Sequence, residues 1–188
     1  MWQSKKIKPK PCAMCDKEFT PRRSLQKVCS PLCAVRYTQA QKAKKAVKLE
    51  RAKVKQKREE LATVPELAKK AQAAFNAFIR ARDKGKPCIS CGAPLGHAPN
   101  SYDAGHYRSV GSASHLRFDE NNVHGQCKKC NRYLSGNAVA YRAGLIERVG
   151  IYEVERLERD NTPRKWSKDE LRELAEKYKA KNKELRNG

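Results

Sequence analysis

The sequence has no long hydrophobic run and a small supply of apolar residues. Only 39% of its 188 residues are hydrophobic, whereas 33% are charged. No stretch approaches the roughly 18 apolar residues that a membrane-spanning helix needs. No apolar run follows the basic residues near the start, so no signal peptide is expected. The thin apolar supply argues against one large core and favours small units stabilised by other means.

Acidic residues are also scarce. The chain has 20 Asp and Glu against 42 Lys and Arg, which gives a formal net charge of +22. The excess is uneven, because residues 1–60 carry 18 basic residues against 5 acidic ones. Solubility alone needs a smaller charge than this. A polyanionic partner, most simply nucleic acid, is therefore expected.

Eight cysteines form two sets of closely spaced pairs. The pairs are Cys12 with Cys15, Cys29 with Cys33, Cys88 with Cys91, and Cys127 with Cys130. In a reducing compartment, spacings of two or three residues favour metal binding over disulfides. Four thiolates complete a closed tetrahedral zinc site. We therefore expect two structural Zn²⁺ sites, the first in an N-terminal zinc ribbon.

Several segments have helical composition or periodicity. Residues 34–62 contain neither Pro nor Gly and are rich in Ala, Lys and Glu, which predicts a long helix. Charged residues at intermediate heptad positions argue against a coiled coil there. The helix either lies along DNA phosphates or only connects two modules. Apolar spacing and capping residues predict further helices over about 65–83, 138–149 and 151–159, and from Ser167 onward.

The interval between the last two cysteine pairs holds all four histidines. A closed zinc site leaves no open position for chemistry, so these polar residues need another explanation. Residues 101–107 predict a β-strand, followed by a loop to residue 121. A second short segment carries Asn122 and leads into the last cysteine pair.

Residues 88–137 resemble the HNH (ββα-metal) endonucleases. The resemblance implies that His106 is the general base and that Asn122 orients its imidazole. It also implies that Asn131, directly after the last cysteine pair, helps to hold a divalent cation. The reaction implied is hydrolysis of a DNA phosphodiester.

One position departs from that family pattern. The residue before the base is usually an Asp or His metal ligand, and here it is Gly105. Side chains alternate along a strand, so Asp103 shares the face of position 105. We expect Asp103 to serve as the ligand, with Gly105 leaving room, and His115 or His124 as second choices. Few oxygen ligands suit Mg²⁺, with Mn²⁺ as a substitute.

The amino-acid sequence of the same segment is similar to that of the phage NinG (Rap) recombination proteins. The matching pieces are 103–109, 115–122, 125–137 and parts of residues 19–31. This resemblance implies a structure-specific endonuclease for branched DNA such as Holliday junctions and D-loops. It further implies the cytoplasm of a bacterial host and phage recombination proteins as partners. Branch specificity follows from the resemblance alone.

The expected fold class is α+β, small and metal-stabilised. It combines a zinc-bound ββα (HNH or treble-clef-like) core with an N-terminal zinc ribbon and several flanking α-helices. The expected divisions are residues 1–36 (zinc ribbon), 37–84 (basic helical region), 85–150 (nuclease core) and 151–188 (C-terminal helices). Expected DNA contacts are Arg22, Arg23, Lys44, Lys45, Lys48, Arg108, Arg117, Lys128 and Arg132.

Two alternative functions remain open from the sequence. One is a non-catalytic zinc protein that binds or anneals DNA, and the other is an HNH nicking or restriction-type endonuclease. Symmetric cutting of a junction would suit a homodimer. No interface pattern stands out, so the oligomeric state stays open.

Overall fold

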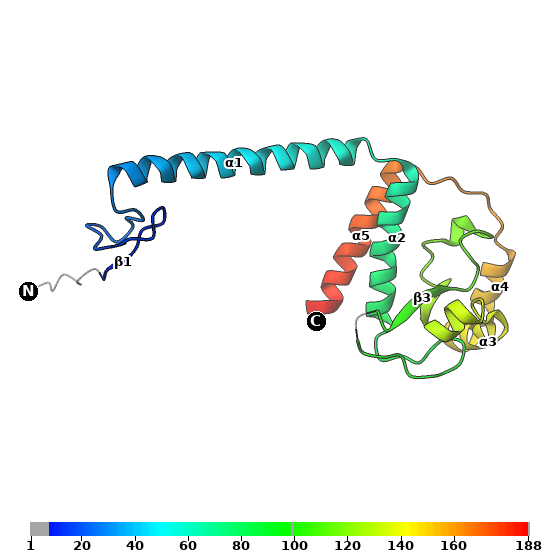
Figure 1. The fold of residues 1–188 in the computed structure, drawn as a ribbon. Coiled ribbons are helices and arrows are strands. Elements are labelled where there is room, and N and C mark those ends of the chain that lie inside the picture. The colour runs from blue at the N-terminus through cyan, green and yellow to red at the C-terminus, as the bar shows by residue number, and fades with distance from the viewer. Residues whose placement is uncertain (1–7, 99, 188) are drawn as a thin grey trace, which may run out of the picture. The chain divides into compact units, whose positions relative to one another are not determined.

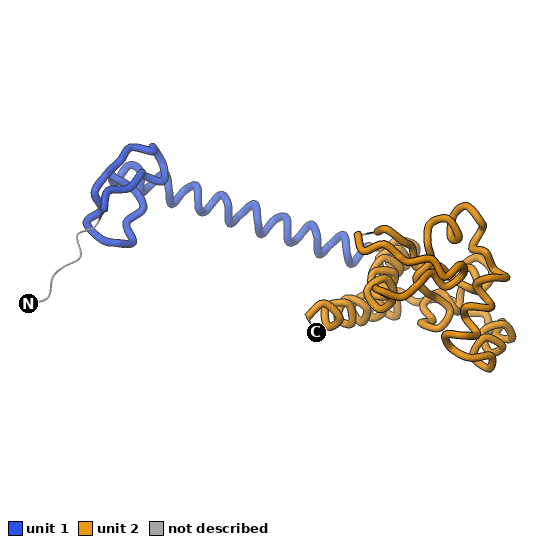
Figure 2. The backbone as a smooth tube through the Cα atoms, turned by 90° about the horizontal axis from the view of Figure 1, so that it is seen from below, with its two compact units in different colours: residues 1–61 blue, residues 62–188 orange. Residues whose placement is uncertain are grey.

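The computed structural model describes residues 8–98 and 100–187. The first seven residues of the expected zinc ribbon lie outside this part. The chain forms two compact units, residues 1–61 and 62–188 (Figure 2). This differs from the expected four-part division, because the second helix and the C-terminal helices share a unit with the strands. No described helix is long and apolar enough to cross a membrane.

The first unit consists of a minimal hairpin and one long helix (Figure 1). Strand β1 (Lys10–Pro11) pairs antiparallel with β2 (Glu18–Phe19). Helix α1 (Pro31–Glu60) starts as predicted, with the Ser30 hydroxyl accepting a 3.2 Å hydrogen bond from the Cys33 amide. Cys33 is its one buried residue. A helix of 30 residues is about 45 Å long, so α1 offers a long solvated surface.

In the second unit, α2 (Val64–Arg82) lies beside α5 (Lys168–Asn187), as Figure 1 shows. The cap predicted at Ser167 is present, since the Ser167 amide donates to Glu170 at 2.8 Å, and α2 has a similar cap in which the Thr63 amide donates to Glu66 at 2.8 Å. The predicted apolar stripes meet in one core. Its helical members are Leu67, Ala71, Phe75, Phe78, Ile79, Leu171, Ala175 and Tyr178.

A two-stranded hairpin lies against this helix pair. Strand β3 (Tyr102–His106) pairs antiparallel with β4 (Val123–Cys127), and His106 lies opposite Val123. Ala104 and Val123 belong to the same core as α2 and α5. Helices α3 (Ala138–Val149) and α4 (Ile151–Arg159) follow, with the bounds that the sequence predicts. The loop expected after β3 contains one short 3-10 turn, Ser114–Leu116.

The end of α2 covers the outer edge of β4. Arg82 donates to the Val123 carbonyl at 2.8 Å, and Asp83 accepts from the Gly125 amide at 2.8 Å. These bonds give partners to the Val123 carbonyl and the Gly125 amide, which would otherwise be unpaired backbone groups at the edge of the sheet. Asp83 is fully buried. Although burial opposes ionisation, the nearby His124 ring, the Arg82 guanidinium and the Gly125 amide hold the pKa of Asp83 far below its ordinary range.

Helix α3 closely approaches the segment between Cys88 and Cys91 at Gly144. A Cβ atom at Gly144 would lie 1.9 Å from the backbone oxygen of Ile89. Only glycine allows this contact, because the obstacle is backbone and cannot turn aside. Leu145, the next residue of α3, is fully buried on the same side of the unit as Ile89.

Gly144→Ala is expected to destabilise residues 62–188. In an open helix, Gly→Ala stabilises by about 0.5–1 kcal/mol. Here the clash should reverse that sign and lower the free energy of unfolding by about 1–3 kcal/mol. Urea unfolding followed by circular dichroism measures the change. The matched control, Val139→Ala in the same helix, is 88% exposed and should stay within about 0.5 kcal/mol. A more stable Gly144→Ala protein would contradict the close approach.

Candidate functional site

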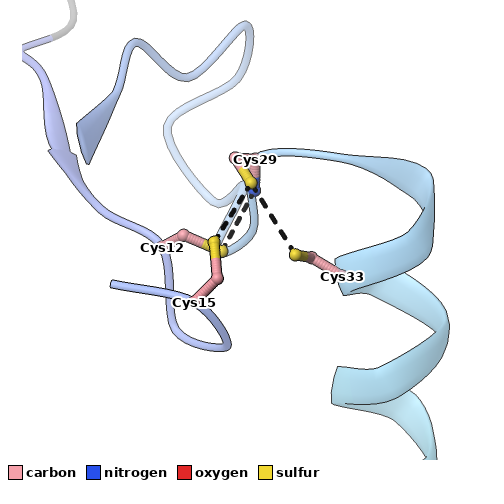
Figure 3. Close-up of side chains that lie close together, drawn as sticks. All are labelled: Cys12, Cys15, Cys29 and Cys33. Carbon is pink, nitrogen blue, oxygen red and sulfur yellow. Dashed lines mark hydrogen bonds between the residues drawn. The ribbon is translucent and has the colours of Figure 1, made fainter. Parts of the chain in front are cut away.

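The eight cysteines form two clusters, each with four sulfur atoms within 4.8 Å of one another. The Sγ atoms of Cys15 and Cys29 lie 3.6 Å apart, and those of Cys29 and Cys33 lie 3.7 Å apart (Figure 3). Cys91 and Cys127 are separated by 3.8 Å. A zinc tetrahedron with 2.3 Å bonds has edges of about 3.8 Å, whereas a disulfide is about 2 Å long. Both clusters therefore fit a four-thiolate metal site, as predicted.

Backbone amides point at these sulfurs. The Cys29 amide donates to Cys12 Sγ at 3.4 Å, and the Cys127 amide donates to Cys88 Sγ at 3.3 Å. Although burial opposes ionisation, amide hydrogen bonds lower the pKa of Cys12 to about 6 and that of Cys88 to about 7. The thiolate is the form that binds metal. The donor set thus suits Zn²⁺ without rearrangement of the backbone.

The second cluster brings the two expected cation ligands together. Asn131 follows Cys130 directly, and its Nδ2 donates to Asp103 Oδ2 at 2.9 Å. Arg132, which we expected to contact DNA, instead donates to both oxygens of Asp103 at 2.7 and 2.8 Å. Arg132 holds the pKa of Asp103 below its usual range. The Asp103 carboxylate is thus already paired with the positive charge of Arg132.

Gly105 does not leave an open space beside Asp103, contrary to our expectation. A Cβ at Gly105 would lie 2.1 Å from Gln126 Oε1. Gln126 is fully buried, and its Nε2 donates to Ser90 Oγ at 2.7 Å and to the Gly136 carbonyl at 2.6 Å. The Gly136 carbonyl cannot donate, so this amide orientation is required and Oε1 faces Gly105. Oε1 has no hydrogen-bond partner among the described residues.

His106 is held in one tautomer. Its Nε2 lies 3.1 Å from the Arg117 carbonyl oxygen, which can only accept. Nε2 therefore carries the proton, and the lone pair is on Nδ1. Burial lowers the pKa of His106 below its ordinary value of 6.5, so the neutral form predominates near neutral pH. Because side chains alternate, His106 points to the face of β3 opposite to Asp103.

Asn122 does not orient the imidazole directly, which corrects our expectation. Its side chain is buried and bonds to the backbone on both sides of the loop. Its Oδ1 accepts from the Arg108 amide at 2.8 Å, and its Nδ2 donates to the Leu116 carbonyl at 3.1 Å. Leu116 precedes Arg117, whose carbonyl holds His106. Asn122 thus fixes the loop that fixes the histidine.

Two expected phosphate contacts are engaged within the protein. The guanidinium of Arg108 bonds to the carbonyls of Leu157 and Asp160, at 2.8 and 2.5 Å, and so satisfies the end of α4. Arg117 is half-buried and donates to Gln72 at 2.7 Å. Neither side chain is free to bind phosphate as placed.

The second-choice cation ligands also lie elsewhere. His115 Nε2 is 2.8 Å from the Asp160 carbonyl oxygen. His124 is buried, with its Nδ1 3.0 Å from Arg82 and 3.7 Å from Asp83. No hydrogen bond or ion pair joins either histidine to Asp103, so the structure does not bring these side chains to that carboxylate. The remaining expected DNA contacts are exposed: Arg22, Arg23, Lys44, Lys45, Lys48 and Lys128.

These features define a small α+β protein with two cysteine tetrads suited to metal. The family model for the bacteriophage lambda NinG protein matches residues 4–188. The chain is 41% identical over 186 residues to Protein ninG of Salmonella phage P22, covering 92% of this chain and 90% of the relative. It is 40% identical over 187 residues to Protein ninG of Escherichia phage lambda, with coverages of 92% and 90%. The chain belongs to the NinG family. No solved structure matches.

Cysteine substitutions should separate the two metal sites. The wild-type chain should carry two zinc ions, one for each cluster. Cys91→Ser should release one ion and lower the unfolding temperature of residues 62–188. Cys15→Ser should also release one ion but leave that temperature unchanged, because its cluster belongs to the other unit. Zinc content after passage over a weak chelator, together with thermal unfolding, tests this. Retention of both ions by either variant would contradict the assignment.

Proposed function

We propose that this NinG-family chain is an HNH-type, divalent-cation-dependent endonuclease that hydrolyses phosphodiesters in branched DNA. The observation that carries the proposal is the state of His106. It is neutral, its Nε2 is held by a backbone carbonyl, and its Nδ1 lone pair is left to accept a proton from water. His106 differs in this respect from His124, which is buried and engages both of its ring nitrogens.

Asp103 and Asn131 offer the oxygens for a cation on the other side of the strand. A hydrated Mg²⁺ held there would stabilise charge on the leaving oxygen. In an in-line displacement, the attacking and leaving oxygens lie on opposite sides of the phosphorus. His106 and Asp103 point to opposite faces of β3, so one phosphodiester would have to reach both groups past the edge of this strand. Arg132 must then release Asp103 when the cation binds.

The charge distribution supports a DNA substrate bound mainly through its backbone. Exposed lysines run along α1, and further basic residues lie along the second half of α5. Phosphate contacts position a protein without reading sequence. Recognition by shape, as expected for branched recombination intermediates, fits such a surface better than recognition of a fixed site.

His106→Ala should abolish cutting while DNA binding remains. Loss of a general base costs about 100- to 10,000-fold in rate. Cleavage of labelled four-way junctions, D-loops and linear duplexes, with and without Mg²⁺, measures the effect. His97→Ala is the matched control, since His97 is exposed and outside the site. Circular dichroism confirms that both variants fold.

The same experiment decides between the alternatives. Cutting by His106→Ala at the wild-type rate would exclude His106 as the base. Binding without cutting in any divalent cation would favour a non-catalytic DNA-binding protein. Cutting of linear duplex at fixed sequences would favour a nicking or restriction-type enzyme.

The pH dependence of cutting should reflect the lowered pKa of His106. The base is active when neutral, so activity is lost as the pH falls through its pKa. Burial, opposed by the bond to the Arg117 carbonyl, places that pKa below 6.5. Single-turnover rates from about pH 5 to about pH 8 should therefore fall by half at a pH below 6.5. A midpoint above 6.5 would contradict a buried, uncharged imidazole.

A further inference from the structure

An exposed tyrosine projects from the turn that carries Asn131. Residues Lys129–Tyr133 form a single π-helical turn, closed by a 3.1 Å bond from the Leu134 amide to the Lys129 carbonyl. Tyr133 at its end is 81% exposed, and Leu134 is 48% exposed. No described residue makes a hydrogen bond to the Tyr133 hydroxyl. Single π turns are frequent at functional sites.

The turn is exposed but firmly held. The Gly136 amide donates to the Cys130 carbonyl at 3.0 Å, and the Gly136 carbonyl accepts from buried Gln126 at 2.6 Å. Asn137 Nδ2 lies 3.7 Å from the sulfur of Cys130, a metal ligand. Ser135 has a φ of 47°, in the left-handed region that non-glycine residues rarely adopt. The fold therefore holds Tyr133 outward on a rigid base.

The surroundings of Tyr133 are basic. Lys129 precedes it by four residues, the spacing at which helical side chains meet, and Lys128 and Lys129 are both exposed. Arg132, the preceding residue, bonds to Asp103. Tyr133 lies on the same turn as Asn131, two residues further along.

A second exposed tyrosine shows that exposure alone is not the signal. Tyr152 in α4 is 87% exposed, but its neighbours Glu153 and Glu155 are acidic. Glu153 and Glu155 pair with Arg156 and Arg159, so no excess positive charge is left there to bind a phosphate. At Tyr133 the aromatic ring and the positive charge coincide, and this combination suits a nucleobase beside a phosphate.

We propose that Tyr133 is a stacking platform for an unpaired or unstacked base at a DNA branch point, with Lys129 binding the adjacent phosphate. The proposal rests on the proposed function, because it names how the same site selects branched DNA. Plain duplex keeps its bases stacked and offers no free face to the ring. Branched DNA exposes bases at the point of strand exchange, so the platform should discriminate between the two.

The test measures binding rather than cutting. The full chain carrying His106→Ala is titrated, without added divalent cations, with a four-way junction and with linear duplex of the same length. The junction carries 2-aminopurine beside the branch point. Adding Tyr133→Ala should weaken junction binding by about 5- to 150-fold, the range that one base–aromatic stack provides. It should change duplex binding less than about twofold and abolish the change in 2-aminopurine fluorescence.

Controls separate stacking from charge and from folding. Tyr133→Trp should keep junction binding, since an indole also stacks. Tyr152→Ala should leave both substrates unaffected. Lys129→Ala should weaken both, because a phosphate contact is independent of the branch.

Equal loss on junction and duplex, or no loss on either, would overturn the proposal. No loss on either would point to a protein partner for Tyr133. Cleavage by the wild-type chain is scored separately. If junction binding depends on Tyr133 but the wild-type chain cuts no DNA, the proposed endonuclease activity is contradicted and the stacking role of Tyr133 is supported. If the wild-type chain cuts junctions and Tyr133→Ala binds them with unchanged affinity, the endonuclease activity is supported and the stacking role of Tyr133 is contradicted.

Discussion

The cysteine cluster of the second unit determines how residues 62–188 are arranged. Its four sulfur atoms belong to Cys88, Cys91, Cys127 and Cys130. Cys88 and Cys127, 39 residues apart, are held together at the open end of the β3–β4 hairpin, where Cys127 lies opposite Tyr102. A two-stranded hairpin alone is marginally stable. A structural zinc contributes an apparent 10–16 kcal/mol or so in small domains. Such a site can therefore hold the short strands, the π turn and the loop around His106 in one rigid unit.

Within this unit, backbone groups set the chemistry of the side chains. The Arg117 carbonyl fixes the tautomer of His106, and Asn122 fixes the loop that supplies this carbonyl. On the opposite face of β3 from His106, Gln126 fills the space beside Gly105 and donates to the Gly136 carbonyl, which fixes the turn there. A site held in this way needs little rearrangement to bind substrate. The long helix α1 and its zinc ribbon form a separate unit that adds positive charge.

Local features were predictable because their causes are local. Ser30, Thr63 and Ser167 mark helix starts within a few residues, and the apolar spacing of α2 and α5 identifies the faces that meet in the core. The roles of Arg108, His115 and His124 were not predictable. Their partners, such as Asp160 and Asp83, lie about 40 to 50 residues away and leave no mark on the neighbouring sequence. Tyr133 gave no signal either, because exposure is not visible in a sequence.

The sequence by itself determined the two sets of paired cysteines, the helices, the basic charge and the family, since each depends on residue type and spacing along the chain. Only the tertiary structure decided that the Arg117 carbonyl binds Nε2 of His106, that Arg132 pairs with Asp103, and that Gln126 occupies the space at Gly105. Those outcomes depend on which distant groups meet in the fold. A hydrogen bond or a steric contact forms between neighbours in space, whatever their separation in sequence.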